Sequence, residues 1–192
     1  MLKQTALTII LILVNTLAQA SPITFTFSGI GDLTLNGTNH NNTAFTVTLN
    51  ADNVDVQPPP TLPTYVNLSG TIDLGDLGTA TFDNLLYIYS SQDGGFAGFG
   101  DNDKGDLFGL FDNGFLTYDL ISDFGPLTVG VSDVDDPLQW IDVETSLGKT
   151  TFENFTTATF SATVSAVPLP ASAWLFGSAV VGMIGFVRRK NS

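Results

Sequence analysis

The chain has no cysteine and a single histidine, His40, among its 192 residues. Without cysteine it forms no disulfide bond and has no thiol-based active site. The same counts exclude a zinc site built from cysteine and histidine. A serine-type catalytic triad would need His40 as its base. No nucleophile motif lies near it, and the polar run 39–42 around it predicts a loop, so we expect a solvated histidine and no enzyme.

Basic residues are also scarce, with six lysines and arginines against 19 acidic residues. Four of the six basic residues lie at the two ends of the chain. The segment 21–166 therefore carries two cations, Lys104 and Lys149, against 19 anions, a formal charge of −17. Such a charge disfavours nucleic acids and anionic lipid surfaces as partners. Divalent cations and neutral sugars remain compatible with it, and so does a simple role of the acidity in solubility.

Long apolar runs occur only near the two ends. At the start, Lys3 precedes the apolar run 7–14, and Ala18-Gln19-Ala20 then offers a small-x-small cleavage motif. This order is typical of a secretory signal peptide, here the first 20 residues, cut between Ala20 and Ser21. An uncleaved anchor is the alternative, which the shortness of the apolar run disfavours.

The second apolar run lies near the end of the chain. Residues 171–187 are uncharged, and as a helix they would be about 26 Å long at ~1.5 Å per residue. That length is near the lower limit for crossing a hydrocarbon core of ~30 Å. Arg188, Arg189 and Lys190 follow directly and predict a cytoplasmic stop. With both basic ends in the cytoplasm, the segment 21–166 is expected outside the inner membrane.

This end of the chain resembles the PEP-CTERM sorting signal of Gram-negative bacteria, in its VPLPA-type variant. The resemblance rests on Val167-Pro168-Leu169-Pro170-Ala171, the apolar run and the basic end. Leu169 stands where the founding motif has glutamate. The resemblance implies that an exosortase, a membrane-embedded relative of cysteine peptidases, cuts near the proline motif after transient anchoring. It also implies a link to exopolysaccharide or biofilm matrix. A plain single-pass anchor is the alternative.

The exported segment has the pattern of β-strands. Apolar residues alternate with threonine and other polar residues, and many are β-branched or aromatic, as in half-buried strands. Such segments are found at 23–27, 45–49, 72–74, 80–82, 86–89, 127–131 and 158–164. Glycine, asparagine, aspartate and proline, which favour turns, cluster at 36–37, 39–42, 57–63, 93–95, 112–114 and 135–137. We therefore predict one all-β domain over 21–166, an antiparallel β-sandwich or jelly roll.

Acidic residues cluster in the run 101–106. Asp101, Asp103 and Asp106 offer carboxylate oxygens beside a glycine, which predicts a calcium site. The spacing departs from an EF-hand loop, because Gly105 is the fifth residue and the twelfth is Asp112. A second and weaker cluster comprises Asp133, Asp135 and Asp136. The alternative is that both clusters are acidic turns without a metal.

Aromatic residues offer a second kind of site. Tyr87, Tyr89, Tyr118 and Trp140 are candidates for a surface on which sugar rings stack, and half-buried packing is the alternative. A glycoside hydrolase would need a pair of carboxylates. No motif singles out Glu144 or Glu153, the only glutamates, and both are expected on the surface.

The sequence therefore predicts an exported, non-enzymatic surface or matrix protein with a C-terminal sorting signal. Its expected partners are an exosortase, the membrane through the C-terminal helix, and exopolysaccharide. A carbohydrate-binding β-sandwich of the matrix is the alternative, and a secreted hydrolase comes third.

Overall fold

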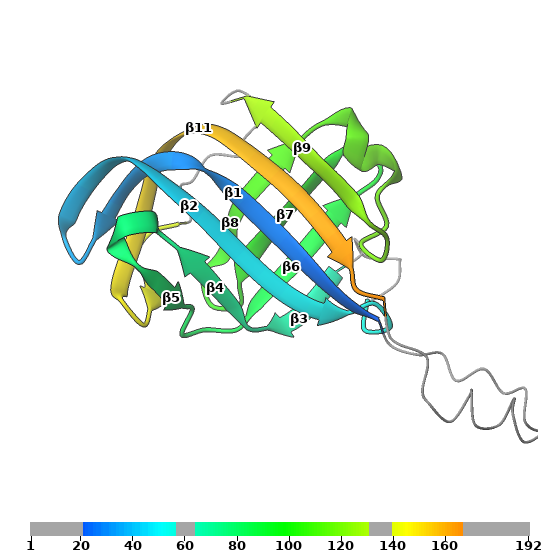
Figure 1. Cartoon of the computed structure of the whole chain (residues 1–192), viewed down its shortest axis with the longest axis horizontal. Coiled ribbons are helices and arrows are strands. Elements are labelled where there is room, and N and C mark those ends of the chain that lie inside the picture. Colours follow the sequence, from blue (N-terminus) through cyan, green and yellow to red (C-terminus); the bar gives the residue numbers. More distant parts are fainter. Residues whose placement is uncertain (1–20, 57–63, 131–139, 167–192) are drawn as a thin grey trace, which may run out of the picture.

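The computed structural model describes residues 21–56, 64–130 and 140–166 (Figure 1). Within these ranges the chain forms eleven β-strands and two short 3₁₀ helices. The strands make two antiparallel sheets, which confirms the all-β prediction. The predicted signal peptide 1–20 and sorting signal 167–192 lie outside the described residues. Among the described ones, no helix is long and apolar enough to span a bilayer.

The larger sheet has seven strands in the order β10-β11-β1-β2-β4-β5, and β9 pairs with the second half of β11. Its three central strands are long, namely β1 (Pro22–Leu35), β2 (Thr38–Asp52) and β11 (Gly148–Val164). The shorter ones are β4 (Gly70–Asp73), β5 (Thr79–Thr81), β9 (Phe124–Gly130) and β10 (Val143–Thr145). The short helix η1 (Gly75–Leu77) joins β4 to β5.

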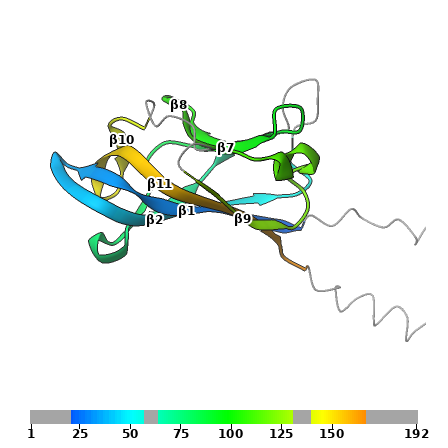
Figure 2. The same cartoon turned by 90° about the horizontal axis from the view of Figure 1, so that it is seen from above.

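The smaller sheet has four strands in the order β3-β6-β7-β8. These are β3 (Thr64–Leu68), β6 (Leu86–Ser91), β7 (Phe96–Asp101) and β8 (Gly105–Phe111), and η2 (Asn113–Thr117) follows. Figure 2 shows the two sheets as separate layers, with β7 and β8 on one side and β1, β2 and β11 on the other.

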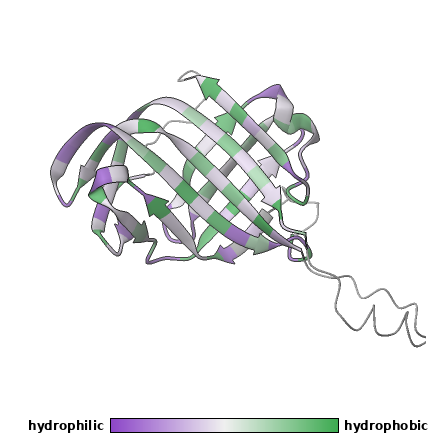
Figure 3. Ribbon diagram, viewed as in Figure 1, coloured by the Kyte–Doolittle hydropathy of each residue, from purple (hydrophilic) through white to green (hydrophobic). Residues whose placement is uncertain are grey.

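The core between the sheets is largely aromatic. Apolar and polar residues alternate along the long strands (Figure 3), so that one face of each strand is buried. Phe27 of β1 contacts Phe99 of β7 and Phe108 of β8, with ring centroids 5.0 and 6.1 Å apart. Trp140 is fully buried, and its indole N–H donates to Thr150 Oγ1 at 3.2 Å. Each such ring contributes about 1.5–3 kcal/mol through burial.

The β1–β2 hairpin turns at Asn36 and Gly37, as predicted. Their φ angles of 51° and 81°, and the pairing of Leu35 with Thr38, make a two-residue turn of type I′. The prediction of a loop at 39–42 is wrong, because these residues belong to β2. His40 consequently lies on a strand opposite Leu33. The polar residues misled the prediction because this end of the hairpin is mostly exposed.

The two ends of the larger sheet meet each other. Phe82, directly after β5, forms a bridge with Thr145 of β10. Ser146 N donates to Thr81 O at 2.9 Å, and Asp83 N donates to Glu144 O at 3.1 Å. These bonds join the two outermost strands of the sheet path, so the sheet curls around one end of the core.

Candidate functional site

Four aromatic residues form a row on the smaller sheet, which we call the tyrosine face: Tyr87, Tyr89, Phe96 and Phe111. Tyr87 and Tyr89 of β6 pair with Gly100 and Gly98 of β7. A Cβ atom at either glycine would overlap the ring of its paired tyrosine. The two rings therefore lie across β7 where it has no side chains. Since Ile88 between them faces the core, this row occupies the opposite, outward side of the sheet.

The tyrosine face is continuous but unevenly exposed. Its ring centroids are 6.0 Å apart for Tyr87 and Tyr89, 5.9 Å for Tyr89 and Phe96, and 5.4 Å for Phe96 and Phe111. Phe111 is 41% exposed, Tyr87 and Phe96 are half-buried, and Tyr89 is only 6% exposed. The accessible part of the row thus lies at its two ends.

The carboxylate of Asp106 on β8 holds the Tyr87 ring in place, because it accepts a hydrogen bond from the tyrosine hydroxyl. Burial raises the pKa of Tyr87 above its ordinary value of 10.0, and the bond to Asp106 raises it further. The Tyr87 hydroxyl is therefore protonated at neutral pH and serves as a donor. Asp106 itself is exposed at the sheet surface.

Most of the residues predicted to stack on sugars are buried in the structure. Trp140 is fully buried and Tyr118 is 3% exposed, so both rings belong to the core. Tyr89 presents almost no ring surface. Of the four candidates only Tyr87 keeps partial access to solvent. Phe96 and Phe111 were missed because no sequence signal distinguishes these two phenylalanines from the buried ones.

The predicted calcium residues lie at the β7–β8 turn. Asp101 ends β7 and is fully buried. Its carboxylate accepts the backbone N–H groups of Asp103 at 2.7 Å and Lys104 at 3.2 Å, and Asn84 Nδ2 at 3.1 Å. These bonds make Asp101 an organiser of the turn, the role in which aspartate side chains bond to backbone nearby.

The three carboxylates of Asp101, Asp103 and Asp106 do not assemble into a ligand set. In the part of the chain that the structure describes, no three acidic or histidine side chains converge as metal ligands. The physical reason is that Asp101 is engaged within the turn while Asp106 bonds to Tyr87. The second cluster, Asp133, Asp135 and Asp136, lies outside the described residues.

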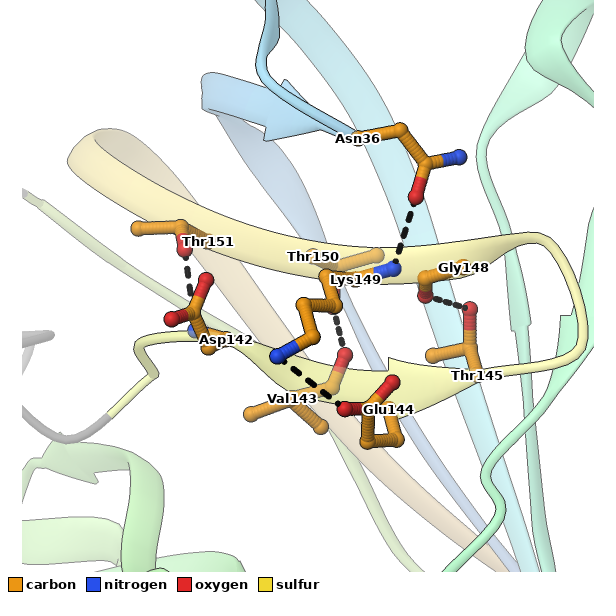
Figure 4. A network of polar contacts seen from close by, with 9 residues as sticks. All are labelled: Asn36, Asp142, Val143, Glu144, Thr145, Gly148, Lys149, Thr150 and Thr151. Atoms are coloured by element: carbon orange, nitrogen blue, oxygen red, sulfur yellow. Dashed lines mark hydrogen bonds and ion pairs between the residues drawn. The ribbon is translucent and has the colours of Figure 1, made fainter.

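Both glutamates lie on the strands of the larger sheet. Glu144 of β10 forms an ion pair with Lys149 of β11, with Nζ and Oε1 3.2 Å apart (Figure 4). Glu153 on β11 is exposed. Both placements agree with the expectation of surface residues. The Glu144–Lys149 pair is about half exposed, so it contributes less than about 1 kcal/mol.

Asn36 ties the β1–β2 turn to the β10–β11 hairpin, and we call this contact the Asn36 clamp. Its Oδ1 accepts from Lys149 N at 3.0 Å, and its Nδ2 donates to Leu147 O at 2.8 Å. Figure 4 shows Asn36 reaching across to the strand that carries Gly148 and Lys149. The clamp fixes one end of the larger sheet and is structural in nature.

The two ends of the described domain lie side by side. Ile23 of β1 pairs with Val164 of β11, and Ser165 N donates to Pro22 O at 2.8 Å. Figure 1 shows the start of β1 and the end of β11 at the same corner. β11 ends three residues before Val167, the first residue of the predicted sorting motif.

A shallow pocket of about 430 Å³ opens at this corner. Its lining includes the polar residues Asn50, Asp52, Asp55 and Asn67 and also Tyr65. Tyr65 is buried, and its hydroxyl donates to Leu120 O at 3.2 Å. Burial first, and then the charge of Asp55, raise the pKa of Tyr65 above 10.0. The lining of the pocket thus combines two carboxylates with a neutral tyrosine.

No known protein family matches this chain, and comparisons with curated proteins and with solved structures find no match either.

Proposed function

We propose that this chain is an exported, non-enzymatic structural protein of the cell surface or extracellular matrix. Its C-terminal segment holds it in the inner membrane until an exosortase cuts near residues 167–171. The proposal combines the C-terminal motif with the geometry of the domain. The observation that supports it most directly is that the two ends of the domain meet at one corner, and that β11 ends before Val167.

This geometry supports release by a single cut. A break after residue 166 removes no strand from either sheet and exposes none of the aromatic core. The proline motif suits the cut as well, because Pro168 and Pro170 lack backbone N–H donors and disfavour helix at the residues before them. Extended backbone is the form in which peptidases generally bind a substrate. The body of the protein would leave the membrane with its fold intact.

Replacing Pro168 and Pro170 together with alanine is expected to abolish processing in the native host. The released form should give way to a longer form in the membrane fraction, which intact mass and immunoblotting of the fractions would detect. Deletion of the host's exosortase should have the same effect. Asn191→Ala, beyond the basic end, is the matched control and should be processed normally. Unchanged mass and location in the double variant would contradict the proposal.

Carbohydrate binding by the tyrosine face is the second candidate. The observation that favours it is the Tyr87 ring, which Asp106 holds across the bare backbone at Gly100, next to a row that ends in exposed Phe111. Sugar rings stack on such planes, and Asp106 and the Tyr87 hydroxyl are polar partners for sugar hydroxyl groups. An exopolysaccharide chain could lie along this row.

A glycan array with the full chain in detergent is expected to identify a matrix glycan under this second proposal. Tyr87→Ala and Phe111→Ala should each weaken its binding about tenfold, since such rings dominate contact energies. Ile141→Ala removes a side chain that is 51% exposed elsewhere and should leave binding unchanged. Signals at background for every glycan, or equal binding by all three variants, would rule the tyrosine face out.

A further inference from the structure

Ser21 is held at two points by Asn53, which follows β2. Asn53 N donates to Ser21 O at 3.1 Å, and Ser21 N donates to Asn53 Oδ1 at 3.0 Å. The first bond continues the β1–β2 ladder beyond its last register pair, Pro22 with Asp52. In the second bond the Asn53 side chain accepts from the Ser21 nitrogen, which is the nitrogen that signal cleavage would free.

Hydrolysis of the Ala20–Ser21 bond changes the chemistry of this nitrogen. Water supplies a hydroxyl to the Ala20 carbonyl and a proton to the leaving Ser21 amine, and the amine takes a further proton near neutral pH. A neutral amide with one N–H thus becomes an ammonium with three N–H groups and a positive charge. Hydrogen bonds from charged donors are roughly twice as strong as neutral ones.

The surroundings of Ser21 favour a positive charge. Asp52 and Asp55 flank Asn53, and Asp55 N donates to Asp52 O at 2.9 Å to close the turn. On the other side, the Asp123 carboxylate accepts from Val164 N, at the end of β11, at 2.6 Å. Tyr65, on β3 in the adjacent pocket, remains neutral because its pKa is raised. The charged groups named here, those of Asp52, Asp55 and Asp123, are all carboxylates, so this corner is acidic.

We propose that Asn53, in an acidic turn that also contains Asp52 and Asp55, is a binding site for the chain's own α-ammonium group. The site is completed when the signal peptide is removed before Ser21, and in this respect the inference rests on the proposed export. Binding of the ammonium fixes the start of β1 between β2 and β11. The domain therefore gains stability at the corner that leads to the sorting signal, and gains it only after export.

The test compares two chains that both end at Ser192, one starting at Ser21 and one retaining Gln19-Ala20, in the same detergent. The chain that starts at Ser21 should have a thermal unfolding midpoint about 3 °C higher at pH 6. Circular dichroism of the β-sheets would measure both midpoints. A free α-amino group has a pKa of roughly 7.7–8.0, and the carboxylates favour its charged form in the folded state. The gain in stability is therefore complete below that range. It is lost as pH rises through the pKa of the amino group in the folded state, which is the higher of the two. The midpoints should coincide above about pH 10.

Variants at Asn53 separate this site from a general effect of the extension. Asn53→Ala should remove the difference between the two chains at pH 6, and Asn53→Asp should enlarge it. Asn50→Ala on β2 loses the bond that Thr24 Oγ1 of β1 donates to Asn50 Oδ1. It should lower the unfolding midpoint of both chains equally. Equal midpoints at pH 6, or a difference that persists at pH 10, would overturn the site.

The mass of the exported protein tests the maturation step separately. A first residue other than Ser21 would overturn the link to export, whatever the two midpoints show. Normal cleavage before Ser21 with equal midpoints would overturn only the ammonium site and leave the proposed function standing.

Discussion

Replacing Phe27 with alanine is expected to lower the free energy of unfolding by about 3–5 kcal/mol. Phe27 is fully buried and contacts Phe99 and Phe108 of the smaller sheet and Phe160 of β11, the last at a centroid distance of 4.8 Å. Its loss leaves a cavity where the two sheets meet, because the surrounding rings are held by their own strands. Urea unfolding of the purified chain would measure the change.

Phe111→Ala is the matched control for this prediction. It deletes the same side chain from a strand of the smaller sheet, at a position that is 41% exposed. Its cost should be about 1 kcal/mol or less, because little burial is lost. Similar losses in the two variants would mean that the sheets do not share the core described above.

Gly148→Ala is expected to destabilise the protein by about 3 kcal/mol. Gly148 has a φ of 112°, which L-residues rarely adopt, and a Cβ there would overlap Asn36 Oδ1. The variant therefore combines backbone strain of about 1–3 kcal/mol with damage to the Asn36 clamp, whose bonds contribute about 1 kcal/mol each. Thermal or urea unfolding would detect the loss.

Gly130→Ala provides the comparison, since a Cβ at Gly130 meets no atom of the described residues within 4 Å and its φ is not in the positive range. Its stability should change by less than about 0.5 kcal/mol. Asn36→Ala should reproduce part of the Gly148 effect. If Gly148→Ala behaves like Gly130→Ala, the clamp contributes nothing to the fold.

The strand pattern of the larger sheet was readable from sequence because its strands have one buried and one exposed face. The predicted segments 23–27, 45–49 and 158–164 lie within β1, β2 and β11, although these strands are much longer than predicted. In β1 the second half escaped notice because Gly29, Gly31 and the register shifts beside Ile30 interrupt the alternation. In β2 the first half escaped notice because its residues are polar and mostly exposed.

The smaller sheet was harder to predict because glycine replaces the outward side chains. β7 and β8 show no clear alternation, since Gly98, Gly100 and Gly109 stand within them. Short β3 and β10 were missed as well. The run 101–106 consequently looked like a free metal-binding loop, whereas it turns the chain between two paired strands.

The candidate sites depend on contacts between distant residues. Asn53 lies 32 residues from Ser21, and Tyr87 lies 19 residues from Asp106. Neither spacing corresponds to a known motif, so only strand pairing brings these groups together. The predicted sorting motif is the opposite case, because it is read from neighbouring residues in the sequence and lies outside the described residues.

The meeting of β5 and β10 also has a consequence for association between copies of the chain. The outermost strand of a sheet normally presents unpaired N–H and C=O groups, on which another copy can grow a strand. Here the Phe82–Thr145 bridge and its flanking bonds occupy those groups with the chain's own backbone. The closure therefore removes one place at which another copy of the chain could pair edge to edge.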